Sequence, residues 1–569
     1  MDVVIGAGAA VLVGGVAARG FLRWRQLFKA KHRSLHGHPR LSRRLARLIP
    51  SFHYSEAEFF ASDSAPVDVI QRRRLGFHRL ACLLQQRARK TVELSEAAAR
   101  DLSDLQFTSA YRVPLPYSRY AREHLKLGAF VQQSSGVKLT DLDGNQAYDV
   151  GGSYGVNLFG YDFYKSCVDA GIERVRHLGP VLGAYHPVVE DNVRRLRQIS
   201  GLDEVSFHMS GTEAVMQAVR LARYHTGRTR LVRFCGAYHG WWDGVQPGVG
   251  NPRAVPDAFT LEDLSEHTLR VLARRRDIAC VLVNPLQALH PNTDAPADGT
   301  LVASDRRARA DRAAYAAWLT RLREVCTARS IVLIFDEVFV GFRLARGGAQ
   351  EYFGVRADMV TYGKTLGGGL PVGVLCGRRD LMKRFDEDRP SDICFARGTF
   401  NSHPYVMGAM NEFLRRLDEP AIRATYDNLD ATWDERARAL NARLAQQRLP
   451  VEVANLSSIW TICYKTPARY NWMFQYYLRA EGLALSWVGT GRLIFSHNYS
   501  DADFAAVADR IVAAAKTMSD DGWWWHPPGL TNHAIRRQLL LEMAAARLPW
   551  LPQILSSGVI GSYSSPRSR

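Results

Sequence analysis

The chain has 569 residues, with 74 lysines and arginines against 56 aspartates and glutamates, so its formal net charge is +18. Its 47% of hydrophobic and 23% of charged residues are the values of an ordinary globular protein, which excludes a wholly disordered, collagen-like or polytopic membrane protein. From the length we expect roughly two to four domains, or one large catalytic body with extensions.

The first 47 residues combine an apolar run with a basic cluster. Residues 3–18 carry no charge, and ten lysines and arginines without an acid follow between Arg19 and Arg47. A cleaved signal peptide carries its cations before the apolar stretch, so this order predicts a membrane anchor over residues 1–22, with the remainder on the cytoplasmic side. A helix lying on a surface or in the core is the alternative. Because the cations follow an apolar run instead of covering a folded face, we predict no nucleic-acid partner.

The same stretch opens with Val-Val-Ile-Gly-Ala-Gly, which is similar to the start of a dinucleotide-binding fingerprint. Val11 stands where the third glycine belongs, and no acid follows before Glu56, so this signal is weak. The eight cysteines are scattered without a CxxC pair. Their spacing fits neither a zinc site nor a disulfide framework, so we expect no metal site and a reducing compartment.

Residues 40–125 have helical and basic patterns, including Arg72-Arg73-Arg74 and the leucine-rich HRLACLLQQ stretch. They are interpreted as a helical adaptor, with a solvated helix face as the alternative reading of their charges. The C-terminal stretch HAIRRQLLLEMAAARL (533–548) is also helical. This helix could pack in the core, form a dimer contact or lie on a membrane surface, and the sequence does not decide among the three.

After residue 141, short apolar runs alternate with helical patterns. Continuous apolar strands separated by helices are typical of a mostly parallel sheet covered on both faces, so we predict an α/β fold. Ligands of such sheets bind at the carboxyl ends of the strands. The six runs are VSFHM (205–209), LVRF (231–234), IACVLV (278–283), IVLIF (331–335), MVTY (359–362) and VGVLC (372–376).

Two small turns follow the first two runs. Ser210-Gly211-Thr212 precedes a helical pattern, and unpaired backbone N–H groups at a helix N-terminus suit a phosphate, although an ordinary helix cap uses the same residues. Tyr238 and His239 lie on a glycine-flanked loop. An aromatic face there can stack on a flat ring, or it can simply pack in the core.

Two charged residues follow later runs. Asp336 comes directly after IVLIF, and a carboxylate at the buried end of an apolar strand needs a metal, a cation or a protonated heterocycle, unless it caps a helix. Lys364 follows MVTY and precedes a glycine-rich turn. Such a lysine can lose its proton by desolvation and attack a carbonyl. Binding a phosphate is the alternative, but GKTLGGG lacks the P-loop spacing.

As a set, these four features match what pyridoxal phosphate requires: a phosphate anchor, a stacking surface, a partner for the pyridinium nitrogen and an aldehyde-binding amine. The stretch from about Val137 to Met518, roughly two thirds of the chain, resembles the class III aminotransferases of fold type I, and within them glutamate-1-semialdehyde 2,1-aminomutase. The segments that carry this resemblance are LTDLDGNQAYDV, MSGTEAVMQAVRLARYHTGR, YHGWWD, DEVFVGFRLARGGAQEYFGVRADMVTYGKTLGGGLPVGVLCG and GTFNSHP.

The resemblance implies a role for each candidate residue. Lys364 would form the internal aldimine with pyridoxal phosphate and later move a proton, and Asp336 would hold the ring nitrogen protonated. Tyr238 and Val338 would enclose the ring on its two faces. The remaining implied cofactor contacts are Ser210, Gly211, Thr212, His239 and, across the interface of a homodimer, Thr399.

The resemblance also implies an α/β fold of the type I transferases, with a mostly parallel sheet in the large domain, a smaller α/β domain and a helical N-terminal extension. The family commonly has Glu-Pro where this chain has Asn284-Pro285, which bears on substrate choice, and the added ends suggest a different substrate or setting. The expected division is an anchor (1–22), a basic helical extension (23–130), the first part of the small domain with a linker (131–200), the large cofactor-binding domain (201–415), the small domain (416–520) and a tail (521–569).

We therefore predict an enzyme that transfers an amino group on a small amino or oxo substrate, as an aminotransferase or a 2,1-aminomutase. Racemisation or decarboxylation on the same scaffold is the nearest alternative, because the pocket selects the bond that breaks. A catalytically silent membrane-bound scaffold is the alternative from another class, and the presence of both Asp336 and Lys364 argues against it. Arg343 and Arg346 are candidates for a substrate carboxylate or for structural ion pairs.

Overall fold

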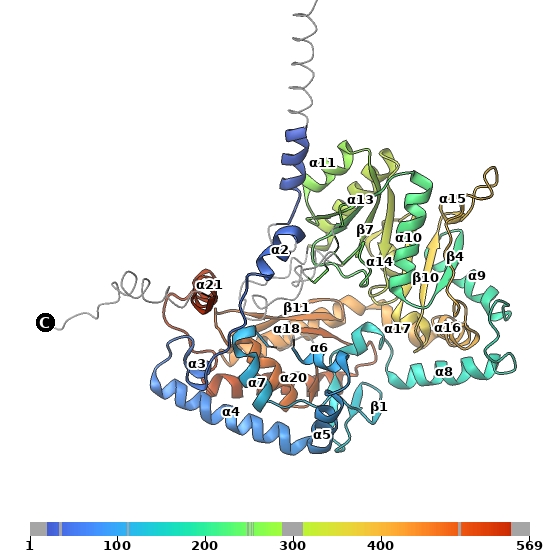
Figure 1. Ribbon diagram of the computed structural model, residues 1–569. Coiled ribbons are helices and arrows are strands. Elements are labelled where there is room, and N and C mark those ends of the chain that lie inside the picture. Colours follow the sequence, from blue (N-terminus) through green and yellow to red (C-terminus); the bar gives the residue numbers. More distant parts are fainter. Residues whose placement is uncertain are drawn as a thin grey trace, which may run out of the picture.

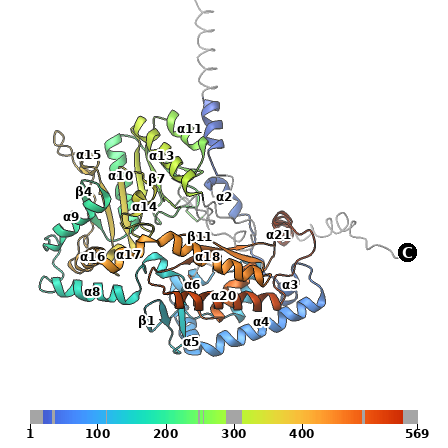
Figure 2. The same ribbon diagram turned by 180° about the vertical axis from the view of Figure 1, so that it is seen from behind.

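The computed structural model shows two packed bodies (Figure 1). The upper one, in green and yellow, is an α/β layer structure, and the lower one combines blue helices with orange and red elements. The view from behind shows the same arrangement, with α4 and α20 running along the lower body (Figure 2). The structure describes residues 20–547 apart from 33–36, 111–112, 247–249, 252, 254, 287–310 and 487–490.

The upper body is built on a seven-stranded sheet with the order β4-β10-β9-β8-β7-β5-β6. Neighbours from β9 to β6 are parallel, and β10 is antiparallel to both β4 and β9, which confirms the predicted mostly parallel sheet. All six predicted strands are present; β6 is the strand that the sequence analysis does not predict. The strands are β4 (Glu204–His208), β5 (Arg230–Phe234), β6 (Ala258–Leu261), β7 (Ile278–Val283), β8 (Val332–Asp336), β9 (Met359–Gly363) and β10 (Gly373–Gly377).

Helices cover both faces of this sheet, because its strands are apolar on both sides. On one face, α10 packs Val215, Ala218 and Leu221 against the strands. On the other face, α9, α11, α13 and α16 bury side chains such as Leu319 and Phe413. The helices around this sheet are α8 (Tyr161–Val175), α9 (Val188–Ser200), α10 (Gly211–Thr226), α11 (Glu266–Arg274), α13 (Arg312–Ala328), α14 (Gly348–Phe353), α15 (Arg379–Met382), α16 (Pro404–Arg416) and α17 (Pro420–Asp427).

The lower body has a single hydrophobic core that draws on both ends of the chain. Phe59, Phe77 and Tyr117 from the N-terminal extension are buried together with Trp433 and Trp523 from the C-terminal part. The N-terminal extension and the C-terminal residues therefore form one core, that of the lower body. Its elements are α3 (Glu56–Ala61), α4 (Val67–Arg87), α5 (Arg89–Ala98), α6 (Ser103–Ala110), α7 (Ser118–His124), β1 (Gln133–Ser135), β2 (Lys138–Thr140), β3 (Gln146–Asp149), α18 (Leu429–Gln446), β11 (Val451–Leu456), β12 (Ile459–Tyr464), α19 (Phe474–Ala480), β13 (Leu483–Ala484), β14 (Arg492–Ile494), α20 (Asp501–Asp520) and α21 (Asn532–Arg547).

Buried polar contacts fasten the extension to this core. Arg73 of α4 is fully buried and donates to both carboxylate oxygens of Asp63, at 2.8 and 2.7 Å, while its Nε donates to the carbonyl of Gly522 at 3.0 Å. The hydroxyl of Tyr470 donates to the carbonyl of Phe59 at 2.6 Å. A bidentate arginine–carboxylate pair is a directional contact, so it fixes how α4 lies against the C-terminal residues.

Residues 20–32 and 37–49 lie on the upper body instead. A helix over residues 20–29 and helix α2 (Pro39–Ala46) follow one another along the large domain (Figure 1). The backbone N–H of Glu262 donates to the carbonyl of Ala30 at 2.8 Å, and Arg43 donates to the carbonyl of Asn251 at 3.0 Å.

The predicted anchor over residues 1–22 falls almost wholly on residues 1–19, which lie outside the described residues, as does the fingerprint-like stretch. Within the described part of the chain, no helix is both long enough and apolar enough to cross a membrane.

Candidate active site

Two charged side chains come together where the neighbouring strands β8 and β9 end. Asp336 is the last residue of β8 and pairs in register with Thr361 of β9, and Lys364 follows β9 as the first residue of a 3-10 turn. Burial lowers the pKa of the Lys364 amine, whereas the nearby charge of Asp336 raises it. A lowered pKa increases the share of the neutral amine, which is the form that attacks a carbonyl.

The backbone of Lys364 is in the left-handed region, with φ of 49°. For any residue other than glycine this conformation is less stable by about 1–2 kcal/mol, and such backbone strain is found most often at functional sites. It is held by its surroundings, since Gly363 before it is extended and the turn residues Thr365 and Leu366 after it are buried. The surrounding structure thus fixes the direction in which the lysine leaves the strand.

Three donors hold the carboxylate of Asp336. The ring Nδ1 of His239 donates to Oδ2 at 2.6 Å, and the hydroxyl of Thr361 donates to Oδ1 at 3.1 Å. The backbone N–H of Val338 also donates to Oδ1, at 3.1 Å. Because His239 is buried and its ring faces Asp336, it acts on the site through this carboxylate.

The Ser210-Gly211-Thr212 turn begins α10 beside these residues. The hydroxyl of Ser210 accepts a backbone N–H of the first helical turn at 3.3 Å, as an N-cap does. A Cβ on Gly211 would lie 2.7 Å from Cγ1 of Val338, and a Cβ on Gly240, whose φ is +89°, would overlap Thr212. Glycines therefore let the turn, Val338 and the Tyr238–His239 loop approach one another closely.

These residues fit the group that the resemblance implies. Among the described residues, Nε2 of His239 and Oδ1 of Asn284 are buried without a hydrogen-bond partner. Tyr238 is 62% exposed, and burial of its hydroxyl together with the charge of Asp336 raises its pKa. A helix N-terminus, an available aromatic face, a fixed carboxylate and a buried amine are the contacts that pyridoxal phosphate needs.

Thr399 is the predicted site residue that the structure does not bring into this cluster. It lies on the exposed segment 397–400. Arg220 of α10 donates to the carbonyl of Phe395 at 2.9 Å, so the helix that begins at the phosphate turn also holds the backbone leading to Thr399.

Arg343 and Arg346 have structural partners. Arg343 is buried and donates to the carbonyl of Phe495 at 2.7 Å and to the hydroxyl of Ser458 at 3.0 Å. It therefore ties the segment after β8 to the small domain. Arg346 donates to Oδ1 of Asp418 at 3.0 Å. The structure thus shows an ion pair for Arg346 and buried hydrogen bonds for Arg343.

Three neighbours of the site have no place in the sequence predictions. Thr361 holds Asp336, but threonine is common in strands and gave no signal. The amine of Lys364 lies 5.7 Å from the ring centroid of Phe339, and a Cβ on Gly155 would lie 2.6 Å from the same ring and 3.5 Å from Cδ of Lys364. The glycine-rich run GGSYG (151–155) was the signal for this turn, since glycines mark close backbone approach.

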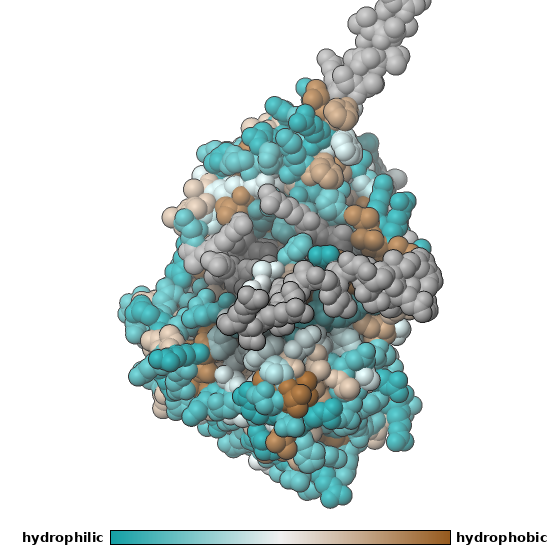
Figure 3. All heavy atoms as spheres, turned by 90° about the vertical axis from the view of Figure 1, so that its left-hand side faces the viewer, coloured by the Kyte–Doolittle hydropathy of each residue, from teal (hydrophilic) through white to brown (hydrophobic). Residues whose placement is uncertain are grey.

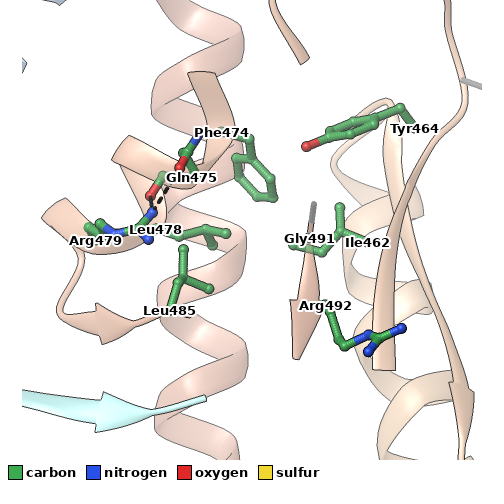
Figure 4. Close-up of a pocket in the computed structure, with 9 residues that line it drawn as sticks. All are labelled: Ile462, Tyr464, Phe474, Gln475, Leu478, Arg479, Leu485, Gly491 and Arg492. Carbon is green, nitrogen blue, oxygen red and sulfur yellow. Dashed lines mark hydrogen bonds between the residues drawn. The ribbon is translucent and has the colours of Figure 1, made fainter. Parts of the chain in front are cut away.

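Arg492 is a further cation near Lys364, and its charge lowers the pKa of that amine. It also lines a small cavity between α19 and strands β12 and β14, in which Phe474 and Tyr464 lie on opposite sides (Figure 4). The cavity is lined by Ile462, Tyr464, Phe474, Gln475, Leu478, Arg479, Leu485, Gly491 and Arg492.

Glu337, next to Asp336, is fully buried. Its Oε2 accepts the N–H of Ala349 at 2.6 Å and its Oε1 accepts the N–H of Gln350 at 3.1 Å. Burial raises the pKa of Glu337 from 4.5 to about 8, because the two N–H donors offset only part of the desolvation cost.

This raised pKa predicts a pH dependence of stability. A carboxyl group that binds its proton more tightly in the folded state contributes stability below its unfolded pKa, and loses it as pH rises through the folded value. We expect the free energy of unfolding to fall between pH 4.5 and about 8, and to fall less steeply in Glu337→Gln. Urea unfolding of both proteins across this range measures the two slopes. Equal slopes would show that the carboxyl of Glu337 titrates normally.

The class III aminotransferase family model matches residues 119–246 and 308–515. Glutamate-1-semialdehyde 2,1-aminomutase of Geotalea daltonii is 31% identical over 414 residues, which cover 68% of this chain and 90% of the relative. The enzyme of the same name from Nitratidesulfovibrio vulgaris is 33% identical over 400 residues, covering 67% and 90%.

Solved structures with this fold include an omega-transaminase from Sphaerobacter thermophilus, with a TM-score of 0.61, 25% identity and coverage of 75% of this chain and 98% of the other. A glutamate-1-semialdehyde aminomutase from Pseudomonas aeruginosa has a TM-score of 0.62 at 18% identity, covering 79% of this chain and 99% of the other. This likeness confirms the predicted type I transferase fold. By its sequence matches, the chain belongs to the class III aminotransferases, pyridoxal-phosphate-dependent enzymes that transfer amino groups.

Proposed function

We propose that this chain moves an amino group onto or along a small oxo substrate, with Lys364 and Asp336 as its catalytic residues. The observation that carries the proposal is the pairing of a buried amine of lowered pKa with a firmly held carboxylate at the ends of adjacent strands. The relatives named above are aminomutases, which makes transfer within one molecule the first reaction to test.

Each residue of the site contributes one part of this chemistry. Pyridoxal phosphate, when bound, supplies an aldehyde for the substrate amine and a ring that withdraws electrons. The amine of Lys364 would hold the cofactor through its aldehyde, and as a buried amine of lowered pKa it would serve as the group that moves a proton at the reacting carbon. Asp336 would keep a proton on the ring nitrogen, and His239 and Thr361 hold Asp336 in place. The N-terminus of α10 would bind the phosphate through Ser210, Gly211 and Thr212.

A screen of amine donors tests the reaction class. The protein loaded with pyridoxal phosphate is mixed with single amino compounds, and conversion of the bound cofactor to its pyridoxamine form is followed by absorbance. Conversion by a donor, followed by return on adding an oxo acid, supports amino transfer. Loss of CO₂ or of optical activity without conversion would instead support a decarboxylase or a racemase. A protein that binds the cofactor and converts no donor would support the silent scaffold.

We propose in addition that the protein works as a homodimer. The described surface of the single chain exposes large apolar side chains, which soluble proteins often bury at subunit interfaces. Thr399 lies on the same exposed segment as Phe395 and Phe400. Light scattering should give about twice the chain mass of 63.8 kDa, and a single-chain mass would contradict the proposal. The exposed side chains are Tyr185, Trp241, Ile393, Phe395 and Phe400.

We propose, from the sequence, that residues 1–22 tether the enzyme to the cytoplasmic face of a membrane. Deleting residues 1–19 keeps the residues of the described helix over 20–29, and it should move most of the protein from the membrane fraction to the supernatant when cells are lysed in high salt, which weakens contacts that depend on charge. Fractionation of cells expressing either form measures this. Full-length protein that is found in the supernatant without detergent would contradict the tether.

A further inference from the structure

The helix over residues 20–29 has an aromatic ridge that faces away from the large domain. Phe21, Trp24 and Phe28 are spaced as neighbours on one helix face, and they are 60%, 59% and 55% exposed. Their rings form a row, with centroids 6.0 Å apart between Phe21 and Trp24 and 5.6 Å apart between Trp24 and Phe28. Leu27 and Ala30 pack against the large domain. One apolar side of this helix therefore packs against the protein. A second apolar side is not covered by any described residue.

Helix α2 repeats this arrangement. Leu41 and Leu45 of the helix and Leu48, two residues beyond its end, are spaced four and three residues apart, and all are exposed. The other side of α2 faces the large domain, where Ser42 is buried and Arg43 donates to backbone carbonyls. Two consecutive helices thus turn hydrophobic side chains outward, and such exposed apolar surface marks an interaction site.

The cations of this segment flank the apolar ridge. The exposed Arg23, Arg25 and Lys29 lie on the first helix, and Arg40 and Arg44 lie on α2. From residue 3 to residue 55 the sequence has no aspartate or glutamate. A surface of this composition attracts a partner that is both anionic and able to take up apolar side chains.

The C-terminal helix α21 extends the same surface. Arg547 donates to the carbonyl of Leu48 at 2.5 Å, which joins the end of α21 to the end of α2. Leu540 and Leu541 of α21 are exposed. The acid of this helix, Glu542, is paired with Arg469, at 2.8 Å. Its charge is therefore balanced, and α21 adds apolar area without adding negative potential.

We propose that this surface, formed by residues 20–29, α2 and α21, lies flat on an anionic lipid bilayer. The aromatic and leucine side chains enter the headgroup region while the arginines contact lipid phosphates, as interfacial amphipathic helices do. Nucleic acid would use the arginines and leave the leucines of α2 exposed to water, so the bilayer fits the composition better. In the side view, brown side chains lie at the top of the molecule next to the grey N-terminal trace (Figure 3).

This inference goes beyond amino transfer and does not depend on it. It also differs from the tether over residues 1–22, because contacts made by the helix over 20–29, α2 and α21 would orient the catalytic body on the membrane. A tether alone would leave the body free to rotate, whereas contacts from three helices would hold one side of it toward the lipid.

Tryptophan quenching in the full-length protein tests the contact. The probes are vesicles of phosphatidylcholine, with or without phosphatidylglycerol, carrying brominated acyl chains that quench tryptophan on contact. We expect the quenching gained on adding phosphatidylglycerol to be mostly lost in Trp24→Phe and kept in the matched control Trp241→Phe. Because Trp24 lies two residues beyond the proposed tether, its quenching shows that this helix meets the lipid, and the variants near α2 separate the surface contact from the tether. Unchanged quenching in Trp24→Phe would overturn the proposal.

A second variant tests the apolar side of α2. In vesicle flotation, the double variant Leu45→Asp and Leu48→Asp should lose the part of binding that depends on phosphatidylglycerol and falls with salt. Leu75→Asp, at an exposed leucine of α4, should keep that part. Equal flotation of the two would overturn the proposal. A lower molar mass of the double variant with unchanged flotation would also overturn it, because it would place a second copy of the chain on this surface. Tighter binding of an RNA oligonucleotide than of anionic vesicles would overturn it as well.

Discussion

Lys364→Ala is expected to lose covalent attachment of pyridoxal phosphate and to lower the rate of amino transfer by at least about ten-thousand-fold, the upper range for removing a positioned acid–base group. The reason is that the buried amine has two tasks at one place, to bond the aldehyde and to carry a proton. Borohydride reduction followed by mass measurement reads the attachment, and single-turnover absorbance reads the rate. A variant that still gave the reduced adduct at wild-type yield would place the nucleophile elsewhere.

The backbone at Lys364 supplies a control for this experiment. With φ at 49°, an alanine keeps the left-handed strain, whereas a glycine relieves roughly 1–2 kcal/mol of it. Lys364→Gly should therefore be more stable than Lys364→Ala in urea while being equally inactive. Added methylamine should restore part of the activity in either variant, because a free amine can occupy the vacated space. Rescue of activity by methylamine would show that the variant lacks only the amine and that its site is still folded.

The second large effect is expected for Asp336→Asn, which replaces the carboxylate by an amide of the same shape. The variant loses the negative charge that keeps a proton on the ring nitrogen, so the rate should fall by about 100- to 1,000-fold, as when one preorganised electrostatic group is removed. Cofactor binding should weaken much less, because the contacts to the phosphate remain. Steady-state rates and a cofactor titration measure the two quantities separately.

His239 offers a comparison for this variant, because it touches Asp336 at 2.6 Å and acts through it. His239→Phe should give a smaller loss of rate, together with a shifted pH profile, since Asp336 would keep Thr361 and the backbone of Val338 as donors. If Asp336→Asn left the rate unchanged, the proposed role of the carboxylate would be wrong, whatever the result for His239.

The sequence predicted the sheet and the centre of the site because both depend on local patterns. Each apolar run is a strand. Asp336 directly follows one run and Lys364 follows another after Gly363, so the adjacency of strands β8 and β9 was enough to bring the pair together. Thr361 and Phe339 were missed because their roles depend on which side chains face each other across separate elements. Such contacts leave no pattern along the chain.

The extension was the least predictable part for the same reason. Its helical patterns were visible, but helical periodicity gives only an apolar face and does not name the partner of that face. Phe59 and Phe77 are buried against Trp523, which lies more than four hundred residues further along the chain. The partners of Arg343 were also not predictable. Its hydrogen bond to the carbonyl of Phe495 joins residues far apart in the sequence and is seen only in the structure.

The core shared by α4 and the C-terminal residues affects how the chain folds during its synthesis on the ribosome. The contact from Tyr470 to Phe59 spans 411 positions, so the segment made first cannot bury its aromatic residues until nearly the whole chain has emerged. Contacts of such long sequence separation form slowly and leave apolar surface open in the meantime. Nascent chains of this protein should therefore need chaperone protection for most of their synthesis.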